Sequence, residues 1–185
     1  MIARDGSALY ALRSALDEPP TPVRLDPARA DQDPVRLPAP GRIHHLPGAV
    51  TDISTTADDG VRIRAWLALP ASASASSPVP LVVWFHGGPV SSWNAWSWRW
   101  NPWLLVERGY AVLLPDPALS SGYGHDFIQR GWGSWGARPF TDLMSITDAA
   151  CDRDDVDASR TAAMGGSFGG YMANWLLGHT DRFKC

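Results

Sequence analysis

The 185-residue sequence predicts an α/β fold built on a mostly parallel sheet. From residue 81 onward, short apolar runs typical of buried strands alternate with stretches of helix-like pattern. Strands joined through helices require right-handed crossovers, and such crossovers place the strands parallel. Before this region, two runs of alternating polarity flank an Asp-Asp-Gly turn, which is a hairpin signal. The pattern therefore predicts one α/β domain that opens with a hairpin.

The first 45 residues differ from the rest and predict a separate segment. Two short strands are expected at residues 8–14 and 23–25, in a context rich in Pro, Asp and Arg, and Asp5-Gly6 provides a turn before the first. We therefore divide the chain into residues 1–45, a segment with a linker, and residues 46–185, the α/β domain.

Within the second part the expected elements follow one another closely. The hairpin strands are 50–56 and 61–69, and the Ala/Ser-rich residues 71–78 form a surface loop without chemistry. Further strands are expected at 81–85, 110–115 and 161–164, with helices near 102–107, 140–151 and 171–177.

The most informative motif joins the last strand to the last helix. Gly165-Gly166-Ser167-Phe168-Gly169 is a G-x-S-x-G pattern between a strand and a helix, the context of a nucleophile elbow. The turn is so tight that Gly165 and Gly169 must lack side chains, and Ser167 becomes the candidate nucleophile. A phosphate-binding loop would need Lys instead of Tyr171, and a dinucleotide fingerprint would need Gly instead of Ser167. Gly133-Ser134-Trp135-Gly136 fails as a second elbow because Trp132 precedes it.

A second motif supplies candidate oxyanion-hole donors. The apolar strand 81–85 ends in His86-Gly87-Gly88-Pro89, and in hydrolases of this build such a loop contributes one backbone N–H. The residue after the nucleophile contributes the other, so the expected donors are Gly88 and Phe168. An ordinary Gly-Gly-Pro turn would be the alternative if the elbow were absent.

These strings resemble the prolyl oligopeptidase family of serine peptidases, closest to its acylaminoacyl-peptidase and dipeptidyl-peptidase-like branch. The resemblance covers roughly residue 51 to the C-terminus and is carried by His-Gly-Gly-Pro at 86–89, Arg-Gly-Tyr-Ala-Val at 108–112, Ser-Gly-Tyr-Gly at 121–124, Trp132-Gly133, Asp157 with Arg160, Gly-Gly-Ser-Phe-Gly-Gly-Tyr-Met at 165–172, Gly-His-Thr at 178–180 and Arg182-Phe183. One departure is Pro-Asp-Pro-Ala at 115–118, where the family more often has an Asn and an Arg-Gly.

The resemblance implies a fold, an activity and a substrate. It implies the N-terminal half of an α/β-hydrolase domain, preceded by the remnant of a β-propeller in residues 1–45. It implies a serine peptidase acting on a peptide or acyl-peptide substrate, with no metal and no organic cofactor. A carboxylesterase or lipase, which shares the elbow and the oxyanion loop, stays open as an alternative, and so does a non-catalytic fragment.

The general base presents a difficulty. A serine triad needs a His and an acid, which follow the nucleophile in this fold, and only His179 and Asp181 do so here. Along a helix His179 would lie ~18 Å from the elbow at ~1.5 Å per residue, too far to act. Upstream, His86 belongs to the oxyanion loop, His44 and His45 to a linker and His125 to a Gly-rich loop. We therefore expect a C-terminally truncated and inactive chain.

Composition narrows the remaining classes. The net charge of −3 gives no basic excess for nucleic acid, and no apolar stretch has the length of a membrane span. Cys151 and Cys185 have no metal-ligand spacing, so a reducing, cytoplasmic location is expected, while the oligomeric state stays open.

Two further clusters have competing interpretations. Five Trp lie between residues 93 and 103, either as an aromatic wall at the active site or, as we favour, as packed rings. Four Asp between residues 152 and 157 lack the Gly and Glu of a calcium loop and favour a solvated turn, in which Asp157 can pair with Arg160.

Overall fold

The computed structural model describes residues 1–41, 43 and 45–185, so His44 of the predicted linker lies outside the described residues. The chain divides into two compact units. One comprises Met1–Leu46 with Trp96–Asn101, and the other comprises Pro47–Ala95 with Pro102–Cys185.

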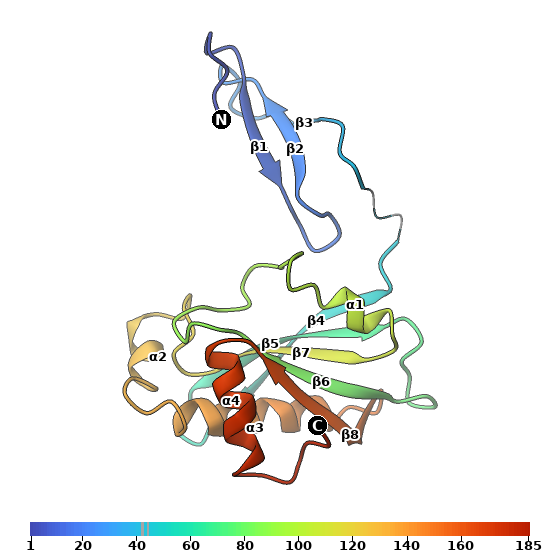
Figure 1. The fold of residues 1–185 in the computed structure, drawn as a ribbon, viewed down its shortest axis with the longest axis vertical. Helices are drawn as coiled ribbons and strands as arrows, with labels where there is room; N and C mark the ends of the chain where they lie inside the picture. The colour runs from blue at the N-terminus through green and yellow to red at the C-terminus, as the bar shows by residue number, and fades with distance from the viewer. Residues whose placement is uncertain (42, 44) are drawn as a thin grey trace. The chain divides into compact units, whose positions relative to one another are not determined.

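The first unit contains a three-stranded antiparallel sheet in the order β1-β2-β3 (Figure 1). Its strands are β1 (Leu9–Arg13), β2 (Thr21–Leu25) and β3 (Val35–Arg36). The strands predicted at 8–14 and 23–25 are confirmed, and β3 is an addition. Glu18 is buried and forms ion pairs with Arg13 at 3.5 Å and Arg36 at 3.1 Å. A carboxylate that leaves water is stabilised by such partners.

The second unit is built on a five-stranded sheet in the order β4-β5-β7-β6-β8. Its strands are β4 (Gly48–Thr56), β5 (Arg62–Pro70), β6 (Val79–Phe85), β7 (Ala111–Asp116) and β8 (Val156–Gly165). The predicted hairpin is confirmed, because β4 pairs antiparallel with β5 along their full lengths. β8 begins five residues before the predicted strand, since Val156 already pairs with Val79 ahead of an irregularity at Pro80/Leu81.

The sheet is mixed, which corrects the prediction of a mostly parallel one. β6 pairs parallel with β7 and with β8, as the crossover argument predicts. β5 pairs antiparallel with β7, so two of the four pairings are antiparallel. The hairpin adds to the parallel strands at β7 rather than at β6, its neighbour in sequence.

Helices cover both faces of this sheet. Figure 1 shows α1 (Trp103–Val106) on one side and α3 (Arg138–Cys151) with α4 (Phe168–Leu177) on the other. A further short helix, α2 (His125–Gln129), was not predicted because it lies in a Gly-rich segment. Alternate residues of the strands meet the apolar faces of α3 and α4 in one core, which includes Ile63, Leu67, Leu81, Val83, Leu113, Leu143, Ile146, Met172 and Leu176. None of the helices in the described residues has the length and apolar character needed to cross a membrane.

A buried ion pair fixes the β4–β5 turn to α3. Arg130 donates hydrogen bonds to Asp59 in the turn and to Asp142 in α3, at distances between 2.9 and 3.1 Å. Asp142 is fully buried and also accepts the backbone N–H of Ala118 at 2.8 Å. The predicted pair of Asp157 and Arg160 is confirmed at 2.6 Å, at the exposed start of β8.

Candidate active site

Ser167 occupies a strained turn between a strand and a helix. β8 ends at Gly165 and α4 begins at Phe168, so the chain reverses within two residues. Ser167 has φ 58° and ψ −121°, a left-handed backbone that residues with a side chain rarely adopt. Its side chain is exposed. Strain of this kind, on the order of 1–3 kcal/mol, persists only where the surroundings impose it.

The glycines that flank Ser167 are required by close backbone contacts. A β-carbon added at Gly165 would lie 2.5 Å from the carbonyl carbon of Gly169. One added at Gly169 would lie 2.3 Å from the carbonyl oxygen of Phe85, the last residue of β6. At Gly166 an added β-carbon would meet no atom within 4 Å. These contacts therefore require glycine at 165 and 169, the two positions that the elbow motif specifies, and they leave room for a side chain at 166.

The structure brings the His-Gly-Gly-Pro loop against Ser167. This loop follows β6, which pairs with β8, so both segments leave the same edge of the sheet. A β-carbon at Gly87 would lie 3.3 Å from Cβ and 3.9 Å from Oγ of Ser167. Gly88 follows with φ 126°, and there an added β-carbon would lie 2.7 Å from the amide nitrogen of Val90. The two motifs, 80 residues apart in sequence, therefore meet at one point.

Buried polar groups form hydrogen bonds with this loop through His86. Nδ1 of His86 lies 2.7 Å from the carbonyl oxygen of Gly87, and Nε2 lies 2.9 Å from Oγ of Ser120. A carbonyl only accepts, so Nδ1 carries the hydrogen, and in the neutral ring Nε2 accepts from the hydroxyl. Burial lowers the pKa of His86, which favours this neutral form.

Asp116, at the end of β7, is the centre of the network. Its carboxylate is fully buried and accepts the backbone N–H of Trp93 at 2.7 Å and the hydroxyl of Tyr123 at 2.5 Å. Burial raises the pKa of Asp116, while these hydrogen bonds and the nearby His86 and Arg64 act in the opposite direction. Burial and the bond to Asp116 raise the pKa of Tyr123 to about 12.

In the described part of the chain, no histidine is hydrogen-bonded to Ser167. Both ring nitrogens of His86 are engaged elsewhere, and His179 stacks on Trp175 with its Nδ1 2.7 Å from the carbonyl oxygen of that residue. His125 begins α2. Among the residues that the structure describes, Oγ of Ser167 has no hydrogen-bond partner.

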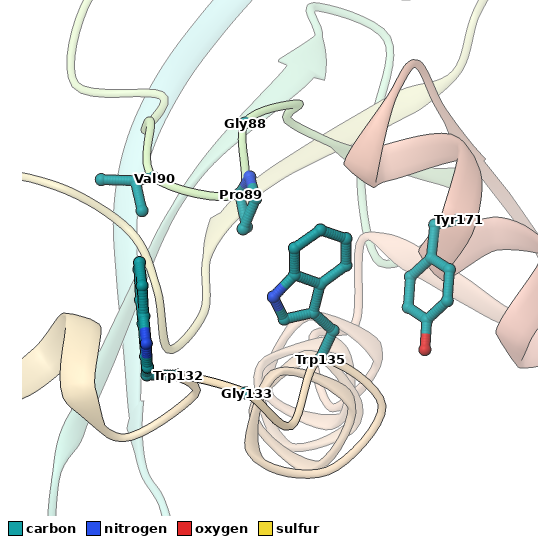
Figure 2. Close-up of a pocket in the computed structure, with 7 residues that line it drawn as sticks. All are labelled: Gly88, Pro89, Val90, Trp132, Gly133, Trp135 and Tyr171. Carbon is teal, nitrogen blue, oxygen red and sulfur yellow. The ribbon is translucent and has the colours of Figure 1, made fainter.

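A cavity of about 660 Å³ opens beside the His-Gly-Gly-Pro loop (Figure 2). Residues from three segments line it: Gly88, Pro89, Val90, Trp132, Gly133, Trp135 and Tyr171. The Trp of residues 93–103 are absent from this lining. Trp93 and Trp103 are buried, and Nε1 of Trp93 donates to the carbonyl oxygen of Trp84 at 3.0 Å, so the packing interpretation is confirmed for these two rings.

Sequence reasoning missed the aromatic residues that do line the cavity. Trp132 entered only as part of the family resemblance and as the residue that excludes a second elbow, and no role in the site was assigned to Trp135 or Tyr171. The available signal was Trp-Gly-Ser-Trp-Gly at 132–136, where large rings occur in a glycine-rich loop that cannot bury them by itself.

Comparison with known proteins identifies the family. Residues 96–185 match the sequence model of the prolyl oligopeptidase family. The chain carries a prolyl oligopeptidase family domain. The matched residues include Ser167 and both cavity tryptophans, Trp132 and Trp135. The His-Gly-Gly-Pro loop lies before residue 96, where the match begins.

Several peptidases are similar to this chain in sequence. Dipeptidyl-peptidase 5 of Schizosaccharomyces pombe is 31% identical over 175 residues, which are 94% of this chain and 25% of the relative. The probable dipeptidyl-peptidase 5 of Emericella nidulans is 40% identical over 118 residues, 63% of this chain and 16% of the relative. The uncharacterized peptidase YuxL of Bacillus subtilis is 36% identical over 134 residues, which are 72% of this chain and 20% of the relative. The chain thus spans a quarter or less of these relatives.

Solved structures of two peptidases share the fold. A puromycin-hydrolyzing peptidase of Mycobacterium tuberculosis has a TM-score of 0.81 at 24% identity, covering 97% of this chain and 28% of its own. The acylaminoacyl peptidase of Pyrococcus horikoshii has a TM-score of 0.80 at 22% identity, and the match covers 96% of this chain and 28% of the peptidase. These similarities show that the mixed sheet belongs to an α/β-hydrolase fold.

Proposed function

We propose that this chain supplies the nucleophile and the oxyanion-binding loop of a serine peptidase that cleaves peptides or acyl-peptides. One observation carries the proposal. Ser167 is held exposed at φ 58°, and its Oγ lies 3.9 Å from the β-carbon position of Gly87 in the His-Gly-Gly-Pro loop. A nucleophile is thereby presented beside a backbone that can approach a substrate oxygen without side-chain interference.

The proposed reaction is acyl transfer through Ser167. Its Oγ attacks the scissile carbonyl carbon, the C=O electron pair moves to oxygen, and the Oγ proton passes to a base. The N–H groups of Gly88 and Phe168 donate to the resulting oxyanion. Phe168 is the first residue of α4, so its N–H has no partner within the helix. The leaving amine takes the proton, and water later hydrolyses the acyl-enzyme.

The base and its orienting acid complete the proposal. None of the described residues places an imidazole on Oγ of Ser167. We assign the histidine and the acid to residues outside this 185-residue sequence, in keeping with the quarter or less of the relatives that this chain spans. Serine-based acyl transfer of this kind uses no metal and no organic cofactor.

We also propose that residues 1–45 are the end of a β-propeller. Three short antiparallel strands in sequence order fit part of a blade, and a blade has four strands. A structure of the full-length protein tests this assignment. It is confirmed if β1, β2 and β3 complete a four-stranded blade, and it is wrong if they form an independent domain.

Substrate hydrolysis by the full-length protein tests the peptidase assignment. We expect turnover of aminoacyl p-nitroanilides and loss of that turnover in Ser167→Ala, with Ser76→Ala as a matched control in the exposed Ala/Ser loop. Turnover of p-nitrophenyl esters without any nitroanilide turnover would favour the esterase alternative. Full nitroanilide activity in Ser167→Ala would refute the role of this serine.

A further inference from the structure

The peptide between the two glycines of the His-Gly-Gly-Pro loop is not oriented by its own sterics. Crowding favours glycine at both positions, since a β-carbon at Gly87 would lie 3.3 Å from Cβ of Ser167 and one at Gly88 would lie 2.7 Å from the amide nitrogen of Val90. A flip of this peptide changes ψ of Gly87 and φ of Gly88, and glycine tolerates the values on either side of such a flip. Another contact must therefore fix the direction of the Gly88 N–H, the proposed oxyanion donor.

His86 supplies that contact. Its Nδ1 lies 2.7 Å from the carbonyl oxygen of Gly87 and donates to it. This carbonyl and the N–H of Gly88 belong to one trans peptide, so they point in opposite directions. The ring therefore holds the carbonyl toward itself and directs the Gly88 N–H away from itself. A lone pair on Nδ1 would instead repel the carbonyl oxygen, so the orientation requires a hydrogen on Nδ1.

Two buried groups determine where the hydrogen of this ring lies. Nε2 is 2.9 Å from Oγ of Ser120 and 3.8 Å from Oδ1 of Asp116. Burial lowers the pKa of His86, so the neutral ring has one hydrogen to place. The carboxylate attracts that hydrogen to Nε2, which would leave Nδ1 with a lone pair. The Ser120 hydroxyl instead donates to Nε2 and keeps the hydrogen on Nδ1.

The fold holds Ser120 in a fixed position. Ser120 is fully buried, and its backbone N–H donates to the carbonyl oxygen of Pro117 at 3.0 Å. The side chain of Leu119, before it, belongs to the hydrophobic core. The N–H of Ser121, after it, donates to the carbonyl oxygen of Ser91 at 2.8 Å. The hydroxyl is thus carried by backbone that is anchored on both sides, inside the domain rather than on its surface.

We propose that Ser120 is a positioning residue of the reaction, which acts through the tautomer of His86 to turn the Gly88 N–H toward the oxyanion. The inference rests on the proposed function, because it concerns the orientation of one of the two donors of that site. Ser120 acts through His86 and the loop rather than on the substrate. An oxyanion donor acts on charge that develops in the transition state, so its misorientation lowers kcat and changes KM little.

Kinetics of the full-length protein on an aminoacyl p-nitroanilide test the role of Ser120. Loss of one oxyanion donor costs about 10²–10³ in kcat. Ser120→Ala should lower kcat by about 10–100-fold, because the peptide loses its preferred direction but still samples it, and KM should stay within about threefold of the parent.

Thr147→Val is the matched control for loss of a buried hydroxyl. Thr147 is fully buried and donates to the carbonyl oxygen of Leu143 within α3 at 2.6 Å, so its substitution should leave kcat unchanged. A kcat of Ser120→Ala within threefold of the parent would overturn the proposal. A fall of equal size in Thr147→Val would overturn it as well.

Two substitutions of His86 separate the position of the donor from packing. Asn places an amide donor near the position of Nδ1, and Gln places one near the position of Nε2. His86→Asn should keep kcat within about tenfold of the parent, whereas His86→Gln should lose about 100-fold. A purely structural role predicts the opposite order, because Gln fills more of the buried space and reaches Ser120. Equal kcat values, or a higher value for His86→Gln, would overturn the proposal.

The tautomer can be measured without turnover, which keeps this inference distinct from the proposed function. In full-length protein with ¹⁵N-labelled histidine, the ring signals of His86 are identified by their loss in His86→Asn. Nuclear magnetic resonance should show the hydrogen on Nδ1 in the parent and on Nε2 in Ser120→Ala. A hydrogen on Nδ1 in both proteins, or on Nε2 in the parent, would refute the role of Ser120 even if the protein hydrolysed no peptide.

Discussion

Substitution of Gly169 by Ala should displace the N-terminus of α4 from β6. The new β-carbon would lie 2.3 Å from the carbonyl oxygen of Phe85 and 3.0 Å from that of His86. Ordinary contact distances require these atoms to move apart by roughly 1 Å. Overpacking costs about 1–3 kcal/mol, and the upper end applies because the obstacle is backbone rather than a flexible side chain. A loss of about 3 kcal/mol lowers the melting temperature of a domain of this size by roughly 6–12 °C.

The same loop offers a matched control in Gly166→Ala. An added β-carbon at Gly166 meets no atom within 4 Å, and this residue has no positive φ. The expected change in stability is within about 0.5 kcal/mol. The two substitutions add the same methyl group three residues apart, so their difference isolates the contact with β6.

Calorimetry and active-site labelling of the full-length protein measure both effects. Gly169→Ala should lower the melting temperature of the hydrolase domain and slow fluorophosphonate labelling of Ser167 by about 100-fold, since a shift of 1 Å is enough to misalign the nucleophile. Gly166→Ala should match the parent in both measurements. Equal melting temperatures and labelling rates for the two variants would refute the steric account of the elbow.

Four further outcomes are expected. Ser167→Gly should raise stability over Ser167→Ala by about 1 kcal/mol, because glycine relieves the positive φ; equal melting temperatures would contradict the strain. Arg130→Met should cost about 3 kcal/mol by leaving buried Asp142 without its cation, while the control Arg160→Met on an exposed pair should cost less than about 1 kcal/mol. Because the pKa of Tyr123 is raised from 10.0 to about 12, its contribution to folding stability is complete below pH 10 and is lost as pH rises through 12. Tyr123→Phe should therefore flatten the dependence of unfolding free energy on pH over this window. Parallel pH profiles for Tyr123→Phe and the parent would exclude the effect. The 185-residue chain alone should show negligible nitroanilide turnover, and a rate like that of the full-length protein would refute this.

The positions of most strands and helices could be predicted from local pattern. The hairpin strands, β6, β7 and the elbow all lie where hydrophobic runs and turn residues indicate them. Pairing could not be predicted in the same way, because periodicity reports which face of a strand is buried and not which strand lies beside it. The antiparallel pairing of β5 with β7 joins segments more than 40 residues apart and is decided by packing.

The site was predictable where a backbone constraint leaves a residue signature. Gly165 and Gly169 are required because the chain approaches itself, so the motif is visible in the sequence and its contacts agree with it. The cavity has no such signature. Trp132 and Tyr171 belong to different segments, and their convergence beside Gly88 follows only from the tertiary fold.

Asp116 shows how the structure gives meaning to an unassigned departure from the family pattern. The Pro-Asp-Pro-Ala string at 115–118 predicted no role, yet its carboxylate joins segments that the chain keeps far apart. It accepts the Trp93 N–H, which follows the His-Gly-Gly-Pro loop, and the Tyr123 hydroxyl, and it lies 3.8 Å from His86 within that loop. An amide at this position would have one accepting oxygen for these donors, whereas a carboxylate has two. The His-Gly-Gly-Pro loop itself is held by the hydrogen bonds of His86 to Gly87 and Ser120, and Asp116 fixes the segment that follows it through Trp93.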